Sequence, residues 1–113
     1  MITDSAFPQI LNEVVARLVN GLQPEQIYLF GSQALGQAQP GSDIDLLVVV
    51  PHSDLPRHQR EAQSYDLLWG LTAPVDVIVL TLDEFQRASM VKTSLSARAR
   101  ETGRLIYARS TDN

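Results

Sequence analysis

The sequence predicts an α/β (α+β) fold in which helices pack on a small mixed β-sheet. Two observations support this prediction. Apolar residues recur at helical spacing over residues 5–20, whereas residues 27–30, 43–50 and 75–80 form short apolar runs, each next to a Gly or Pro. Strand-like and helix-like segments alternate along the chain, which indicates helices packed on a sheet.

Glycine, proline and helix-capping residues predict where these helices and strands begin and end. Gly21 is expected to end the first helix, Pro51 stops the second strand, and Pro56 is tolerated in the first turn of a longer helix. Thr81 or Asp83 is expected to cap a later helix. The expected order is α-β-β-α-β-α-α-β. The first half contains a helix over 5–20, strands over 27–30 and 43–50 with a short helical turn over 32–35 between them, and a helix over 55–71. The second half contains a strand over 75–80, helices from 81 or 83 through about 91 and over 94–102, and a last strand over 105–107.

Composition narrows the class of protein. We expect the 113 residues to form a single domain, 1–113, with its core over about 5–107, because 44% are hydrophobic and 19% charged. A net charge of −4 argues against a protein that depends on nucleic-acid backbone contacts. The chain has no cysteine, no membrane-length apolar stretch and no signal peptide at its start, so we expect a cytoplasmic protein without disulfides or membrane contact.

Asp43 and Asp45 open the second strand. Side chains two apart on a strand share a face, so both carboxylates are expected to point the same way as Leu47, with Ile44 and Leu46 on the other face. Two carboxylates this close repel each other and favour a bound cation, and Mg²⁺ prefers one or two carboxylates plus phosphate oxygens. The alternative is that these aspartates only decorate the solvent end of a strand.

Asp76 lies within the otherwise apolar run 75–80. A carboxylate in such a strand is costly to bury unless it is paired or binds a metal. If this strand lies beside the second one, Asp76 joins Asp43 and Asp45 on one metal-binding face. The alternative is an aspartate at a strand end that faces water, because Pro74 comes just before.

Gly31 and Ser32 lie where the first strand gives way to a turn. Glycine lets backbone N–H groups approach a phosphate closely, and the start of a helical turn favours negative charge. An isolated Gly-Ser pair is usually an ordinary turn. The placement of this pair ten residues before an Asp-x-Asp strand, with a later aspartate on another strand, favours a nucleotide site instead.

Together these stretches resemble the minimal nucleotidyltransferases (MNT family) of the DNA polymerase beta superfamily, including the MntA-like antitoxins of HEPN/MNT modules. The resemblance extends from about Phe7 to Tyr107. The stretches that carry it are Gly31-Ser32-Gln33-Ala34-Leu35-Gly36, Ser42-Asp43-Ile44-Asp45-Leu46, Pro74-Val75-Asp76-Val77 and Gly103-Arg104-Leu105-Ile106-Tyr107.

This resemblance implies transfer of a nucleoside monophosphate, AMP from ATP, to an acceptor hydroxyl, with pyrophosphate leaving. Asp43, Asp45 and Asp76 would bind two Mg²⁺ ions, or Mn²⁺, and Asp76 would also serve as general base. Gly31, Ser32 and Asp43 would bind the nucleotide. The family further implies a partner, a small all-helical HEPN-type toxin, which the nucleotidyltransferase modifies and thereby neutralises as an antitoxin.

One position pair departs from the family pattern. Many members carry arginines in the glycine-serine loop where this chain has Gln33 and Leu35. Two charges that would steady the triphosphate are therefore missing, which leaves nucleotide affinity and the choice of nucleotide open. Two alternatives to a protein-modifying enzyme remain: an antitoxin that neutralises its partner by contact alone, and a transferase acting on a small molecule or an RNA end.

Other residues are interpreted as structural. His52 and His58 are expected to be surface polar residues, with metal ligands as the alternative. An apolar stripe at the end of the long helix is expected to pack in the core, with a partner surface or self-association as the alternative: Tyr65, Leu68, Trp69 and Leu71. Late basic residues are expected to form a solvated helix face, with a substrate or partner contact as the alternative: Arg87, Lys92, Arg98, Arg100 and Arg104.

Overall fold

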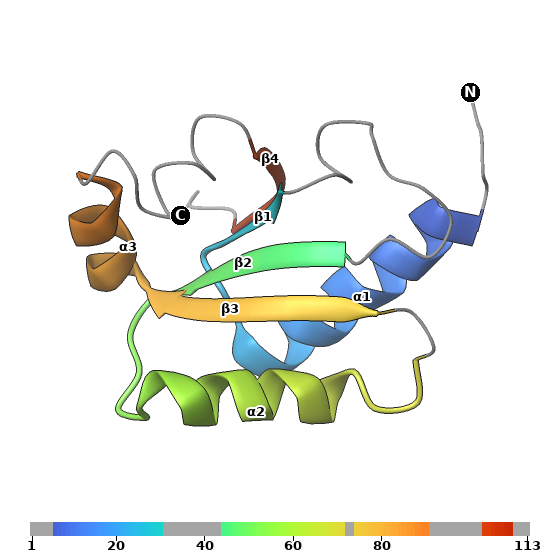
Figure 1. Cartoon of the computed structure of the whole chain (residues 1–113), viewed down its shortest axis with the longest axis horizontal. Coiled ribbons are helices and arrows are strands. Elements are labelled where there is room, and N and C mark those ends of the chain that lie inside the picture. The colour runs from blue at the N-terminus through green and yellow to red at the C-terminus, as the bar shows by residue number, and fades with distance from the viewer. Residues whose placement is uncertain (1–5, 31–43, 72–73, 91–102, 110–113) are drawn as a thin grey trace.

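The computed structural model describes residues 6–30, 44–71, 74–90 and 103–109, and its helices and strands alternate as the sequence predicts (Figure 1). The expected turn over 32–35 and the expected helix over 94–102 lie outside these residues. No helix in the described part of the chain is long and apolar enough to cross a membrane. The elements are α1 (Ala6–Leu22), β1 (Gln26–Phe30), β2 (Ile44–Val50), α2 (Arg57–Leu67), β3 (Val75–Thr81), α3 (Leu82–Ser89) and β4 (Arg104–Ala108).

The described strands form one mixed sheet in the order β3-β2-β1-β4. β2 and β3 run parallel, in a register that extends from Ile44 opposite Val75 to Val50 opposite Thr81. β1 is antiparallel to both of its neighbours, β2 and β4. This mixed sheet with its packed helices confirms the predicted α/β (α+β) fold.

Alternation along the strands divides the core into two clusters. α1 and α2 lie on one face of the sheet, and α3 lies at the end where β2 and β3 finish (Figure 1). The smaller cluster, on the other face, contains Leu47, Val49, Leu80 and Phe85. The larger cluster, beneath α1 and α2, contains Val14, Leu18, Ile27, Leu29, Ile44, Leu46, Val48, Val50, Leu68, Val77 and Val79.

The sequence predicts that Gly21 ends the first helix. In the structure α1 continues to Leu22. The turn after it is made by Gln23, which takes a positive φ of 53°. Gly21 has a packing role instead, because a Cβ at this position would clash with the methyl groups of Leu67. The glycine therefore lets the last turn of α1 approach α2 closely.

α2 is shorter than expected at both ends. It begins at Arg57, because Pro56 is its N-cap residue in an extended conformation with ψ of 157°, and it ends at Leu67. Gly70 then takes a φ of 92°, which turns the chain back toward β3. The apolar pattern runs on past Leu67 because residues of the turn also pack against the core.

α3 begins with a capping box, which confirms Thr81 as the cap. The Glu84 N–H donates to the Thr81 hydroxyl at 3.2 Å, and the Thr81 N–H donates to Glu84 Oε1 at 2.9 Å. These bonds satisfy N–H groups that a helix start leaves without partners. The cap fixes where β3 gives way to α3.

Candidate active site

Asp45 and Asp76 lie directly opposite each other on the parallel strands β2 and β3. Neighbouring strands are about 4.8 Å apart, so opposite residues present their side chains side by side. Asp45 is half-buried and Asp76 is exposed. The sequence analysis expects Asp76 to join the other aspartates only if its strand lies beside that of Asp45. The structure places the two strands side by side.

The strand pattern also sets the face on which the two carboxylates lie. Ile44 and Leu46 are buried under α1 and α2, whereas Leu47 belongs to the cluster on the opposite face. Asp45 shares the face of Leu47 by alternation. The backbone holds this end of the strands together, because the Ile44 N–H donates to the Pro74 carbonyl at 2.8 Å.

β1 ends on the side of the sheet where β2 and β3 begin. Its last residue, Phe30, lies opposite Asp45 in the antiparallel register. The chain continues from Phe30 directly into Gly31 and Ser32. These two residues and Asp43 lie outside the described part of the chain, as do Gln33 and Leu35. The structure thus brings together Asp45, Asp76 and the end of the strand that precedes Gly31 and Ser32 in the sequence.

The donor chemistry of this edge fits a hard divalent cation. Carboxylate oxygens are the protein ligands that Mg²⁺ prefers, and adjacent like charges are stabilised by a cation between them. Among the described residues no group of three His, Cys, Asp or Glu side chains could hold a metal. The predicted third ligand, Asp43, is outside the described residues, so Asp45 and Asp76 form the described portion of the candidate site. Asp76 is exposed and carries no burial cost, so its placement beside Asp45, and not desolvation, is what favours a site.

The far ends of β2 and β3 carry a charged cluster that the sequence analysis did not identify. Arg60 is only 6% exposed and makes two bonds to the Glu84 carboxylate, at 2.8 and 3.0 Å. It also donates to the carbonyls of Leu55 at 2.9 Å and Val79 at 3.0 Å. The side-chain hydrogen bonds from Arg60 lower the pKa of Glu84 from 4.5 to about 2, with further bonds from Thr81 in the same direction. The Thr81-x-x-Glu84 spacing was the available signal, because it is that of a capping box.

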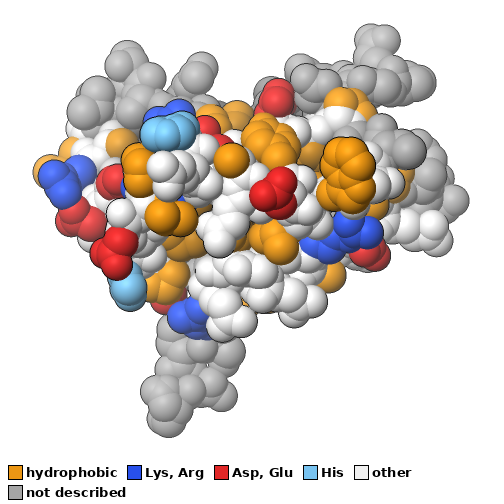
Figure 2. All heavy atoms as spheres, turned by 90° about the horizontal axis from the view of Figure 1, so that it is seen from below, with side chains coloured by type: hydrophobic (Ala, Val, Ile, Leu, Met, Phe, Trp, Pro, Cys, Tyr) orange, Lys and Arg blue, Asp and Glu red, His pale blue; other side chains and the backbone are white. Residues whose placement is uncertain are grey.

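The residues interpreted as structural are placed as follows. His52 and His58 are exposed, as expected. Of the apolar stripe, Leu68 is buried, but Trp69 is 85% exposed and Tyr65 44% exposed, so the stripe only partly enters the core. Figure 2, which looks at α2 from below, shows hydrophobic side chains toward its C-terminal end.

The late basic residues are only partly described. Arg87 is exposed and forms an ion pair with Asp83 within α3. Arg104 is exposed at the start of β4. Lys92, Arg98 and Arg100 lie outside the described residues.

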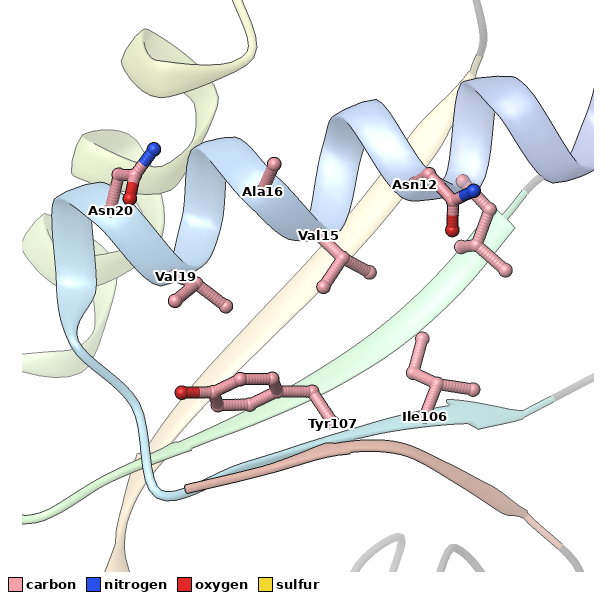
Figure 3. Close-up of a pocket in the computed structure, with 8 residues that line it drawn as sticks. Asn12, Val15, Ala16, Val19, Asn20, Ile106 and Tyr107 are labelled. Atoms are coloured by element: carbon pink, nitrogen blue, oxygen red, sulfur yellow. The ribbon is translucent and has the colours of Figure 1, made fainter. Parts of the chain in front are cut away.

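A groove of about 390 Å³ lies between α1 and β4, away from the carboxylates. Val15 and Val19 of α1 face Ile106 and Tyr107 of β4 across it (Figure 3). The same β4 side chains pack against the larger core cluster, so the groove opens on the α1 face of the sheet. The groove and the Asp45–Asp76 pair are therefore separate features.

Comparison with known proteins agrees with the fold described above. The family model described as nucleotidyltransferase domain matches residues 9–101, which include all three aspartates. A protein of Sulfolobus solfataricus described as a nucleotidyltransferase has a similar structure, with a TM-score of 0.65 at 23% identity over 96% of this chain and 91% of that one. No curated protein gives a significant match.

Two further structures similar to this chain come from toxin–antitoxin complexes. One is described as a toxin–antitoxin with AMP-PNP, with a TM-score of 0.61 and 22% identity. The other is described as a mutant of the toxin–antitoxin MntA-HpeT, in which two aspartates two positions apart are glutamates, with a TM-score of 0.58 and 19% identity. Each match covers 88% of this chain and 73% of the other.

Proposed function

Because the chain belongs to the nucleotidyltransferase domain family, with its polymerase beta-like fold, we propose that it transfers AMP from ATP to an acceptor hydroxyl. The observation that carries this proposal is the register of Asp45 opposite Asp76 on adjacent parallel strands. Two carboxylates at the N-terminal ends of β2 and β3, next to the end of β1, form the acidic part of a site for metal-dependent phosphoryl-type transfer.

In this proposal Asp43, Asp45 and Asp76 hold divalent cations, Mg²⁺ or Mn²⁺. When bound, these ions neutralise charge on the triphosphate and on the leaving pyrophosphate. Gly31 and Ser32 bind the β- and γ-phosphates through backbone N–H groups and a hydroxyl. Each of these roles belongs to a residue of the motifs that resemble the family, and Asp45 and Asp76 are the two whose places the structure describes.

Asp76 has a second role, as general base. Its carboxylate accepts the proton of the acceptor hydroxyl while that oxygen forms a bond to the α-phosphorus of ATP. The bond between the α-phosphorus and the bridging oxygen breaks, and pyrophosphate leaves with the electron pair. The exposure of Asp76 supports this assignment, because an acceptor carried by another molecule must reach the base from solvent.

The acceptor we propose is a hydroxyl on an all-helical HEPN-type toxin, which makes this chain an antitoxin. Support comes from the two similar structures of toxin–antitoxin complexes, one of which contains an ATP analogue. The second also carries exchanges at two aspartates with the same spacing as Asp43 and Asp45.

A second candidate is an antitoxin that acts by contact alone. The observation that favours it is the absence of basic residues at positions 33 and 35, where Gln33 and Leu35 stand. Weak nucleotide binding would leave the carboxylates in place without efficient transfer.

The experiment that tests the proposal is label transfer from α-labelled ATP with Mg²⁺, using this protein and the product of any neighbouring gene that encodes a small helical protein. The variants are Asp45→Asn, Asp76→Asn and the Asp43→Ala, Asp45→Ala double substitution, with Asp66→Asn as an exposed acidic control on α2. A labelled partner band that needs the three site aspartates but not Asp66 supports an AMP-transferring enzyme. A stable complex that neutralises the toxin without label supports the contact-only antitoxin instead.

A further inference from the structure

β3 is an edge strand of the described sheet, and α2 covers its outward-facing backbone. The Val77 N–H donates to the Tyr65 hydroxyl at 3.1 Å. The Val79 N–H donates to Glu61 Oε2 at a longer 3.4 Å. Glu61 and Tyr65 are four residues apart on one side of α2, which is why they meet alternate residues of the strand.

The shorter of these two bonds lies next to the candidate site. Val77 directly follows Asp76, whereas Val79 lies three residues beyond it. Successive residues of a strand direct their backbone groups to opposite sides, so the strand is held by β2 on the inner side and by Tyr65 on the outer side. The position of Asp76 beside Asp45 thus depends on contacts made at both edges of β3.

On the premise of the proposed function, we propose that Tyr65 is a positioning residue, whose hydroxyl fixes the start of β3 so that the Asp76 carboxylate stays in place to share a divalent cation with Asp45. Packing alone holds this point weakly, because Val75 is only half-buried and Asp76 is exposed. Ligands of a metal need accurate placement, and errors of about 1 Å at a reacting centre can cost about 10²-fold in rate.

Tyr65→Phe isolates the hydroxyl from the rest of the side chain. Tyr65 is 44% exposed and its ring is retained, so the substitution opens no cavity. Glu61→Ala is the matched control, since it removes the other side chain of α2 that accepts a hydrogen bond from β3. It also removes the ion pair with Arg57. If Tyr65 acted only by stabilising the fold, Glu61→Ala would lower Mn²⁺ affinity at least as much as Tyr65→Phe.

The test is calorimetric titration of Mn²⁺ into the wild-type protein, Tyr65→Phe, Glu61→Ala and Asp76→Asn, at about 0.15 M salt so that the lost Glu61 charge is screened. Amide hydrogen exchange at Val77 and Val79 gives a second, local readout. For Tyr65→Phe we expect faster exchange at Val77 and Mn²⁺ affinity lower by about 3- to 10-fold, the factor that corresponds to one net hydrogen bond. For Glu61→Ala we expect faster exchange at Val79 and wild-type Mn²⁺ affinity. In the transfer assay kcat should fall by the same factor for Tyr65→Phe, with KM for ATP unchanged.

Unchanged Mn²⁺ affinity in Tyr65→Phe, despite faster exchange at Val77, would overturn the inference. An equal loss of affinity in Glu61→Ala would also overturn it, because it would indicate a general loosening of β3. Failure of the proposed function gives a different result: wild-type protein would bind Mn²⁺ no better than Asp76→Asn, and there would be no site for Tyr65 to position.

Discussion

The two ends of the parallel pair β2 and β3 carry charge in opposite ways. Near their C-terminal ends, the buried Arg60 is matched by Glu84 in two bonds of 2.8 and 3.0 Å and by two backbone carbonyls. At their N-terminal ends, two groups of like charge, Asp45 and Asp76, are held in adjacent register. Removing one partner of a charge pair whose groups satisfy one another destabilises a fold, whereas adjacent carboxylates favour the binding of a cation between them. Under the proposed function, one end of the strand pair serves stability and the other holds the cation.

The largest effect should come from the N-terminal end. Asp45→Asn and Asp76→Asn are each expected to lower AMP transfer on the order of 10³-fold, the scale seen when a group that stabilises transition-state charge is removed. For Asp76→Asn the free energy of unfolding should stay the same or rise, because one of two adjacent like charges is gone. Transfer rates and urea denaturation of the same samples measure both quantities. Activity retained within tenfold in either variant would contradict the assigned roles.

Breaking the C-terminal end should have the reverse effect. Arg60→Ala removes a donor shared by Glu84 and two carbonyls. At about 1 kcal/mol for each lost hydrogen-bond partner, the variant should lose roughly 2 to 3 kcal/mol of unfolding free energy. The Asp45–Asp76 pair should still bind Mn²⁺ wherever the variant remains folded. Urea denaturation of Arg60→Ala measures the first expectation and Mn²⁺ titration the second. A loss below about 1 kcal/mol would mean that the Arg60 cluster contributes little.

Acid should weaken the same cluster over a defined range. The pKa of Glu84 is lowered from 4.5 to about 2 in the folded protein, so its contribution is complete above about 4.5 and is lost as the pH falls toward 2. Solvent reduces the size of this contribution, because the Glu84 side chain is 41% exposed. Melting temperature measured against pH for the wild type and Glu84→Gln should show a steeper decline in the wild type between these values. Parallel curves would contradict the assignment.

The smallest effect is expected at Trp69. This side chain is 85% exposed, so Trp69→Ala should change the free energy of unfolding by less than about 0.5 kcal/mol. Its buried neighbour Leu68 is the matched contrast, because Leu68→Ala should cost about 2 kcal/mol or more. Urea denaturation compares the two. Equal losses would show that the apolar stripe packs as a unit, contrary to the exposure of its members.

The pattern of apolar residues predicted much of the fold. Strict alternation in β2 and β3 assigned Ile44 and Leu46 to one face and Leu47 to the other, as the structure has them. The errors were at helix ends: the sequence predicts that Gly21 ends the first helix, whereas the turn after α1 is made by Gln23 with a positive φ. A residue other than glycine adopts that conformation at a cost, which packing in the folded protein offsets and which local sequence does not reveal.

The sequence alone determined which residues could carry chemistry at the candidate site, because carboxylates two apart on a strand and a glycine-serine pair after a strand are local patterns. It also placed Asp76 in a strand of its own. Only the tertiary structure decided that this strand runs beside β2 with Asp76 opposite Asp45, that Arg60 reaches Glu84 from another helix, and that Tyr65 covers the outer edge of β3. The physical reason is that strand pairing and contacts between helices join residues far apart in the chain, and these depend on how the whole core packs.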